Sequence, residues 1–145
     1  MTDVLAPTAP PALSRRQRMA APAWTIGSLA AATLALHLRD PHQQASWGLC
    51  PLAAVGIWCP GCGGLRAVND LSNGHPLEAA SSNLAFMVAL PFVLVGLTVW
   101  TLDRWRGTRR RVPPVVVRST ATVSVLLLAV FTVVRNLPAG SWLAP

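Results

Sequence analysis

The chain has 145 residues, enough for one small domain and too few for a multidomain enzyme. Hydrophobic residues make up 52% of it and charged residues only 12%, about half the share of about 25% that is usual in soluble domains. With a mean hydropathy of +0.46, this composition argues against a soluble enzyme, a coiled coil or a disordered chain, and it indicates a membrane protein.

The N-terminal part of the chain predicts a tail followed by a transmembrane helix. Residues 1–18 are rich in Pro and Ala and end in a cluster of arginines, so we expect a disordered basic tail there. The uncharged run over residues 20–38 would span roughly 28 Å as a helix, about the thickness of a bilayer core. A cleaved signal peptide is the alternative, but the run is long and no small-x-small cleavage site follows it. We therefore expect residues 19–145 to form a helical membrane domain.

Two further transmembrane helices are predicted over residues 84–102 and 115–134. Residues 81–83 precede the first of them as N-cap candidates. Pro91 falls in the middle of that span, where a membrane helix tolerates it as a kink. Arg118 lies near the start of the last span, close enough to its end for the side chain to reach the interface. Neither feature interrupts a three-span interpretation.

The placement of the arginines predicts the topology. Nine of the twelve fall before the first span or between the second and third, and three fall on the opposite side. By the positive-inside rule, the N-terminus and residues 103–114 are cytoplasmic, whereas residues 39–83 and the C-terminus lie outside. This orientation explains the net charge of +7, and we expect no binding to nucleic acid. The tryptophans fit two aromatic belts, with Trp24, Trp100 and Trp105 on the cytoplasmic side and Trp47, Trp58 and Trp142 on the outer side.

The outer loop contains one further predicted helix. Residues 48–58 are too apolar for an ordinary loop and too short to span, so we expect them to lie in the interface or dip into it. After Gly64 the pattern becomes helical, and Asn73-Gly74 would end the helix after about two turns. An apolar and a polar face predict an amphipathic helix in the outer interface. The apolar face comprises Leu65, Val68 and Leu71, and the polar face comprises Arg66, Asn69 and Asp70, of which Arg66 and Asp70 could pair.

All three cysteines of the chain, Cys50, Cys59 and Cys62, lie just before this helix. Cys59-Pro60-Gly61-Cys62 is a C-x-x-C motif at the predicted helix start, where backbone N–H groups and the helix dipole would lower the pKa of a cysteine. We expect the sulfurs of Cys59 and Cys62 to lie close together. Cys50 should lie near them because the chain between Cys50 and Cys59 folds back through Gly56.

Three interpretations of the cysteines remain open at this stage. Cys59 and Cys62 could form a thiol–disulfide couple with Cys50 as a third partner. The three cysteines could bind zinc, with His75 or His42 as a fourth ligand. Alternatively, the prolines and glycines shape a tight structural turn in which the cysteines form a disulfide or simply pack. A lone C-x-x-C does not decide between them, since the βαβ context of a thioredoxin-like protein is absent.

The cysteine region resembles the domain of unknown function 2752 family of small bacterial membrane proteins. The resemblance covers about residues 45–102. It departs from the family pattern at Leu65, where a threonine is usual, and at Leu84, which replaces a proline. It implies a membrane-embedded helical protein without a settled activity. The motif consists of Cys50, Pro51, Gly56, Cys59, Pro60, Gly61, Cys62, Gly63, Arg66 and Ala67.

Together these observations predict an all-α membrane protein with three transmembrane helices and a short interfacial helix after the CPGCG turn. Paired-carboxylate, G-x-S-x-G and phosphate-binding glycine patterns are absent from the sequence, which favours a non-enzymatic accessory or partner-binding subunit. The alternatives are a thiol–disulfide participant using Cys59 and Cys62, or a zinc site. We expect the bilayer and another membrane protein or a second copy as partners, in a bacterial cytoplasmic membrane. We expect no cofactor unless the cysteines bind zinc.

Overall fold

The computed structural model of the chain describes residues 14–43, 50–108 and 110–144. Helices joined by short connections make up this part of the chain, and no strand occurs in it. The expectations for the N-terminal tail before Ser14, for Trp47 and for Arg109 fall outside the described residues. For the rest, the predicted all-α fold is confirmed.

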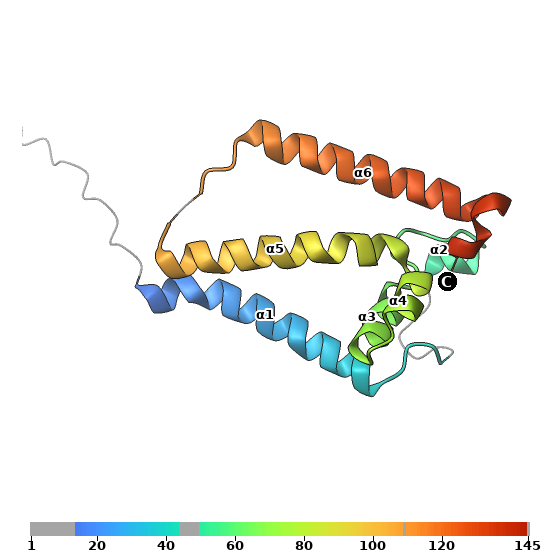
Figure 1. Cartoon of the computed structure of the whole chain (residues 1–145), viewed down its shortest axis with the longest axis horizontal. Helices are drawn as coiled ribbons and strands as arrows, with labels where there is room; N and C mark the ends of the chain where they lie inside the picture. Colours follow the sequence, from blue (N-terminus) through green and yellow to red (C-terminus); the bar gives the residue numbers. More distant parts are fainter. Residues whose placement is uncertain (1–13, 44–49, 109, 145) are drawn as a thin grey trace, which may run out of the picture.

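Three long helices dominate the fold: α1 (Arg15–Leu38), α5 (Leu84–Arg106) and α6 (Pro114–Asn136). Each is long and apolar enough to cross a membrane, which confirms the three predicted spans. α1 and α6 end, and α5 begins, at the same end of the molecule (Figure 1). We call this the cysteine end, because the loop that carries the three cysteines lies there, and the opposite end the arginine end.

Local capping signals set the boundaries of these helices. Ser14 and Gln17 form a capping box, which satisfies backbone donors at the start of α1. The helix therefore begins at Arg15, so the arginines that follow Ser14 form its first turn and not part of a disordered tail. The side chain of Asn83 accepts a hydrogen bond of 2.8 Å from Phe86 N and caps α5, as expected. Gly107, with a positive φ of 75°, ends α5 four residues beyond the predicted span.

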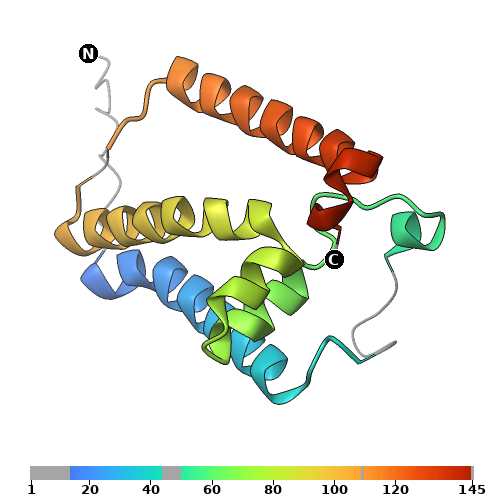
Figure 2. The same cartoon turned by 45° about the vertical axis from the view of Figure 1, so that its right-hand side comes forward.

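Four short helices gather at the cysteine end: α2 (Pro51–Ala54), α3 (Gly64–Ser72), α4 (Pro76–Ser82) and the 3₁₀ helix η1 (Pro138–Leu143). Figure 2 shows α3 and α4 side by side between the ends of α1 and α5. α3 is the short helix predicted after the CPGCG turn. Sequence analysis missed α4, because its residues were interpreted as a turn and as caps. Pro76 at its first position is the local signal that was available.

The short helix α3 buries its polar face, which is the reverse of a surface helix. Asn69 and Asp70 are 7% and 4% exposed, whereas Leu65 is 47% exposed. The Nδ2 of Asn69 donates to the carbonyl oxygen of Leu36 over 2.7 Å and so fastens α3 to the end of α1. Within the described residues Asp70 contacts other side chains, and the expected Arg66–Asp70 pair does not form. The apolar face is left for the membrane interface.

Burial is concentrated at the cysteine end. The most hydrophobic stretches of α5 and α6 contain no buried residue, as expected for helices that face lipid. By contrast, Ala67 and Ala79 are fully buried where α3 and α4 meet, and Asn83 and Arg135 are each 1% exposed. The tightly packed part of the molecule is therefore the region that surrounds the cysteines.

Candidate functional site

The three cysteine sulfurs converge at one point. The Sγ atoms of Cys59 and Cys62 are 2.9 Å apart, and Cys50 Sγ lies 3.7 Å from Cys59 Sγ and 3.5 Å from Cys62 Sγ. The expected proximity of all three is thereby confirmed. All three are free cysteines, because these separations exceed the S–S bond length of about 2.05 Å. The expectation of a disulfide is therefore not supported.

Two tight turns bring the cysteines together. Ile57 N donates to Leu52 O over 2.9 Å, and Gly56 adopts a positive φ of 80° that reverses the chain after α2. A second turn, closed by a 3.0 Å bond from Cys62 N to Cys59 O, leads into α3. The motif glycines and prolines thus place Cys50 beside a C-x-x-C turn to which it is not adjacent in sequence.

Three polar side chains from α5 and α6 hold the C-x-x-C turn by its backbone. Asn83 Nδ2 donates to Pro60 O over 2.9 Å and to Cys62 O over 3.0 Å. Asn136 accepts from Trp58 N over 2.9 Å and donates to Trp58 O over 2.8 Å. Since an amide that both accepts and donates fixes a peptide in place, the turn is clamped from both sides. The third side chain is Arg135.

Arg135 is a buried cation beside the cysteines. Its Nη1 donates to Cys59 O over 2.8 Å and to Cys62 O over 3.3 Å, and its Nη2 donates to Leu143 O over 3.0 Å. The guanidinium also lies 4.9 Å from the ring centre of Phe131, and its Nε has no hydrogen-bond partner. No carboxylate of the described residues forms an ion pair with it. The positive charge of the guanidinium interacts electrostatically with the thiol groups of Cys62 and Cys59.

The cysteines differ in acidity, and not as the sequence predicted. A hydrogen bond from the backbone of Ala53, followed by one from the Cys62 side chain, lowers the pKa of Cys50 to about 7. Burial, followed by hydrogen bonding with Cys59, raises the pKa of Cys62 to about 12. Sequence analysis predicted a lowered pKa in the C-x-x-C motif at the start of α3. That prediction is wrong for Cys62, because burial outweighs any effect of the helix start.

The two histidines considered as a fourth metal ligand lie elsewhere. His75 Nδ1 is 3.2 Å from Glu78 Oε2, and His42 Nε2 is 2.7 Å from Asp70 Oδ1. Within the described part of the chain, the three cysteines are the only group of three or more His, Cys, Asp or Glu residues whose ligating atoms all lie within reach of one another. His75, considered as a fourth ligand, is not part of this group and contacts Glu78 instead.

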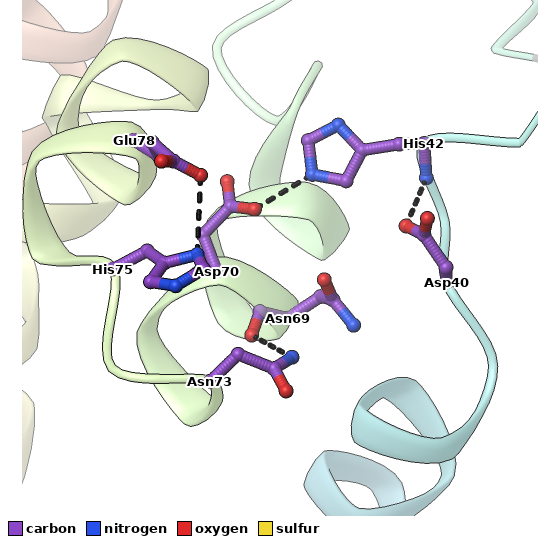
Figure 3. A pocket seen from close by; sticks show the side chains of 7 residues that line it. All are labelled: Asp40, His42, Asn69, Asp70, Asn73, His75 and Glu78. Atoms are coloured by element: carbon purple, nitrogen blue, oxygen red, sulfur yellow. Dashed lines mark hydrogen bonds and ion pairs between the residues drawn. The ribbon is translucent and has the colours of Figure 1, made fainter.

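A polar cavity of about 450 Å³ contains these histidines (Figure 3). The buried Asp70 carboxylate is its centre, accepting a bond of 2.8 Å from Ser82 Oγ in addition to its contact with His42. The sequence carries no local signal for this cavity, since its residues come from α3, α4 and the loop after α1. It is lined by Asp40, His42, Asn69, Asp70, Asn73, His75 and Glu78.

The remaining motif residues shape the turns and helices around the cysteines. Pro51 is the first residue of α2, and Gly63, with a φ of 80°, is the N-cap of α3. Ala67 is fully buried, and Arg66 forms no hydrogen bond or ion pair within the described residues. Sequence analysis noted Arg135 only as one of the outer arginines and overlooked Asn136. An arginine at the end of a predicted span was the available signal.

Part of the chain, including the three cysteines, is similar to a sequence family. The family described as "Protein of unknown function (DUF2752)" matches residues 50–97, which confirms the resemblance expected from the motif. The match includes the three cysteines and Asn83, while Arg135 and Asn136 lie beyond it. No curated protein and no solved structure matches the chain.

Proposed function

We propose that the protein is a small integral membrane protein whose Cys50, Cys59 and Cys62 bind one divalent soft metal ion, with Zn²⁺ as the leading candidate. One observation carries the proposal: three sulfurs lie within 3.7 Å of one another, beside a buried guanidinium with which no carboxylate of the described residues forms an ion pair. Thiolates are the ligands that soft and borderline metal ions prefer in proteins.

The sulfur geometry is close to that of a metal–thiolate site. A tetrahedral ion with metal–sulfur bonds of about 2.3 Å holds its sulfurs about 3.8 Å apart. The distances of 3.5 Å and 3.7 Å from Cys50 approach this value directly. The Sγ atoms of Cys59 and Cys62, 2.9 Å apart, would have to separate by about 1 Å to reach this distance. Three protein ligands leave a fourth position for solvent or an external donor.

Charge balance favours a divalent ion. Three thiolates around a divalent cation carry a net charge of −1, which matches the single positive charge of Arg135. Neutral thiols would leave that cation buried without an anion, an arrangement that costs several kcal/mol. A monovalent ion would leave one negative charge in excess. The buried guanidinium thus supports a divalent metal–thiolate centre.

A second candidate function is thiol–disulfide exchange by Cys59 and Cys62. The 2.9 Å approach of the two sulfurs favours it. A two-cysteine couple gives no role to Cys50, whose sulfur lies 3.7 Å from Cys59 Sγ and 3.5 Å from Cys62 Sγ. We therefore place the metal site first.

We further propose that the cysteine end faces outward in a bacterial cytoplasmic membrane and that the protein is an accessory subunit of another membrane protein. The excess of arginines at the opposite end supports this orientation. At that end Arg15 stacks on Trp105 at 4.6 Å, which is suited to the lipid headgroup region. The exposed apolar surfaces of α5 and α6 support a helical partner within the bilayer.

The experiment that tests the metal site is a binding titration on the reduced, full-length protein in nanodiscs. Zn²⁺ competition with a chromophoric chelator gives affinity and stoichiometry, and Co²⁺ substitution reports thiolate ligation by charge-transfer absorption. We expect one ion per chain, with the absorption lost in Cys50→Ser, Cys59→Ser and Cys62→Ser. His75→Ala and His42→Ala are the matched controls and should bind normally.

Two results would count against this function. Absence of stoichiometric Zn²⁺ and Co²⁺ binding by the reduced protein would remove the metal site. Mass spectrometry of protein alkylated without reduction would show whether cells contain a Cys59–Cys62 disulfide instead. A predominant disulfide would favour the second candidate function.

A further inference from the structure

We infer that the three-cysteine site is a metal sensor whose output is the position of α6 in the membrane. This inference rests on the proposed metal-binding function and deepens it. It comes from one juxtaposition: the side chains that tie α6 to the rest of the protein bond to the turn that carries Cys59 and Cys62.

α6 is attached at one end only. Arg135 and Asn136, its last two residues, bond to the C-x-x-C turn, and Arg135 also bonds to Leu143 in the segment that follows. Within the described residues, no hydrogen bond or ion pair joins α6 to α1 or α5. Both views show α6 lying apart from α5 along its length and joined to the other elements at the cysteine end (Figures 1 and 2).

The other long helices are held differently. α1 packs against α5, and α3 connects to both, in part through the bond from Asn69 to Leu36 O. These elements form one unit that does not depend on the cysteines for its contacts. α6 is therefore a separate element. It is connected to this unit by the hydrogen bonds of Arg135 and Asn136 to residues 58–62, which we call the polar joint.

The carbonyl oxygen of Cys62 is the centre of that joint. It accepts one hydrogen bond from Asn83 at the start of α5 and another from Arg135 at the end of α6. The same residue supplies a sulfur to the three-cysteine site. A ligand bound to the Cys62 sulfur therefore acts on the residue that connects the start of α5 to the end of α6.

Metal binding would strengthen the joint in two ways. The ion links Cys50 to the C-x-x-C turn, so that the two turns behave as one rigid body. The negative charge of the metal–thiolate centre also balances Arg135, which holds the end of α6 in its buried position. Without the ion, Cys50 is no longer linked to the C-x-x-C turn, the two turns move independently, and the hydrogen bonds that hold the end of α6 weaken. α6 then changes its tilt, since lipid contacts do not fix its orientation.

The test measures the α5–α6 distance in the full-length protein in nanodiscs, with and without Zn²⁺. Val95 on α5 and Val125 on α6 are exposed by 64% and 65%, so both accept a keto-bearing unnatural amino acid that carries a spin label and spares the cysteines. We expect a narrow distance distribution with Zn²⁺ and a broader or displaced one after chelation. A reference pair at Leu29 on α1 and Val95 should not respond.

Variants separate the sensor from the metal site. Arg135→Lys keeps the charge but loses the planar guanidinium. We therefore expect Zn²⁺ affinity to fall by ~10-fold or less, while the α5–α6 distance distribution stays broad even with metal bound. Asn136→Ala removes the two bonds to Trp58 and one to Thr132 O within α6, and leaves Arg135 in place. It should give an intermediate distribution, and it guards against misfolding of the first variant. Arg118→Lys, at an exposed position of the same helix, is the matched control and should behave like the parent.

The outcomes are distinguishable. If Zn²⁺ binds with the expected stoichiometry and the α5–α6 distances are the same with and without it, the sensor inference is overturned and the metal site stands. If Zn²⁺ does not bind, both fall together. If α6 responds to Zn²⁺ equally in the parent and in Arg135→Lys, Arg135 is not the coupling residue and the inference as stated is wrong.

Discussion

Cys62 and Arg135 are 73 residues apart in the sequence, yet the guanidinium of Arg135 donates a hydrogen bond of 3.3 Å to the carbonyl oxygen of Cys62. This contact joins the end of the last transmembrane helix to the loop that carries the cysteines. Because both residues are buried, the contact is protected from competition with water. Five predictions concern the stability, reactivity and topology of the protein.

Replacing Asn83 by Ala should destabilise the protein and expose the thiols. The change removes the N-cap of α5, worth about 1 kcal/mol, and leaves Pro60 O without its donor, worth about 1–3 kcal/mol, while Cys62 O keeps its bond from Arg135. We expect a lower melting temperature in detergent and faster maleimide labelling of Cys62. Ser81→Ala, at an exposed hydroxyl that bonds to Glu78 O, is the control and should lie within about ±0.5 kcal/mol of the parent. Equal melting temperatures for the two variants would contradict the claim that Asn83 stabilises the C-x-x-C turn.

In the metal-free protein, Cys50 should react first with iodoacetamide. Its pKa is lowered to about 7, so its thiolate fraction rises as the pH rises through that value. The pKa of Cys62 is raised to about 12, so this thiol should stay unreactive until strongly alkaline pH. Pulsed alkylation across a pH series, with peptide mass spectrometry, gives the order. Alkylation of Cys62 before Cys50 would show that the burial of Cys62 is not maintained.

The same two groups should affect stability with opposite pH dependence. The lowered pKa of Cys50 contributes stability above its unfolded value that is lost as the pH falls through about 7. The raised pKa of Cys62 contributes stability that is complete below its ordinary value of 9.0 and is lost as the pH rises toward about 12. The melting temperature of the metal-free protein should therefore be highest at mildly alkaline pH. Cys50→Ser should remove the loss on the acidic side and leave the alkaline loss in place.

Asp70 should matter for stability more than Arg66, although both lie on α3. Asp70→Ala leaves the buried Ser82 hydroxyl without its acceptor, which costs about 1–3 kcal/mol, and also removes the contact with the exposed His42 ring. Arg66 has no hydrogen bond or ion pair within the described residues, so Arg66→Ala should stay within about ±0.5 kcal/mol. Chemical or thermal unfolding in detergent compares the two variants. A larger effect of Arg66→Ala would mean that this side chain acts outside the contacts described.

A membrane-impermeant maleimide should label Cys50 in intact cells after mild reduction and metal chelation. The prediction follows from the nine arginines at the opposite end of the three spans. A cysteine placed at Thr108, near the arginine end, in a variant with all three native cysteines changed to Ser should be labelled only after permeabilisation. Labelling of position 108 in intact cells, with labelling of the native cysteines only after permeabilisation, would show that the orientation is the opposite of the one predicted.

Local features of the sequence were sufficient for much of the fold. An uninterrupted apolar run identifies each span, because crossing a bilayer demands length and hydrophobicity and little else. Asn83 before the second span and Gly74 after the short helix are capping signals that act within a few residues. The proximity of Cys59 and Cys62 is of the same kind, since a turn of four residues leaves little choice.

Long-range hydrogen bonding could not be predicted in this way. The sequence predicts α3 as an amphipathic helix in the outer interface, and the pattern of its residues does not specify the partners of its polar face. In the structure, Asn69 and Asp70 turn inward to partners on α1, α4 and the loop after α1. Which face is buried depends on the medium around the helix, and the helix sequence alone does not specify it.

The sequence by itself determined that the protein is a three-span helical membrane protein with a cysteine turn, because hydropathy, capping and turn chemistry act over a few residues. Only the tertiary structure decided that His75 does not join the three sulfurs and that Arg135 and Asn136 bond to the backbone of the cysteine loop. These relations depend on where the ends of α5 and α6 meet, a distance that no local pattern encodes. The physical reason is that a buried hydrogen bond is directional and selects one arrangement, whereas apolar helices in lipid accept many.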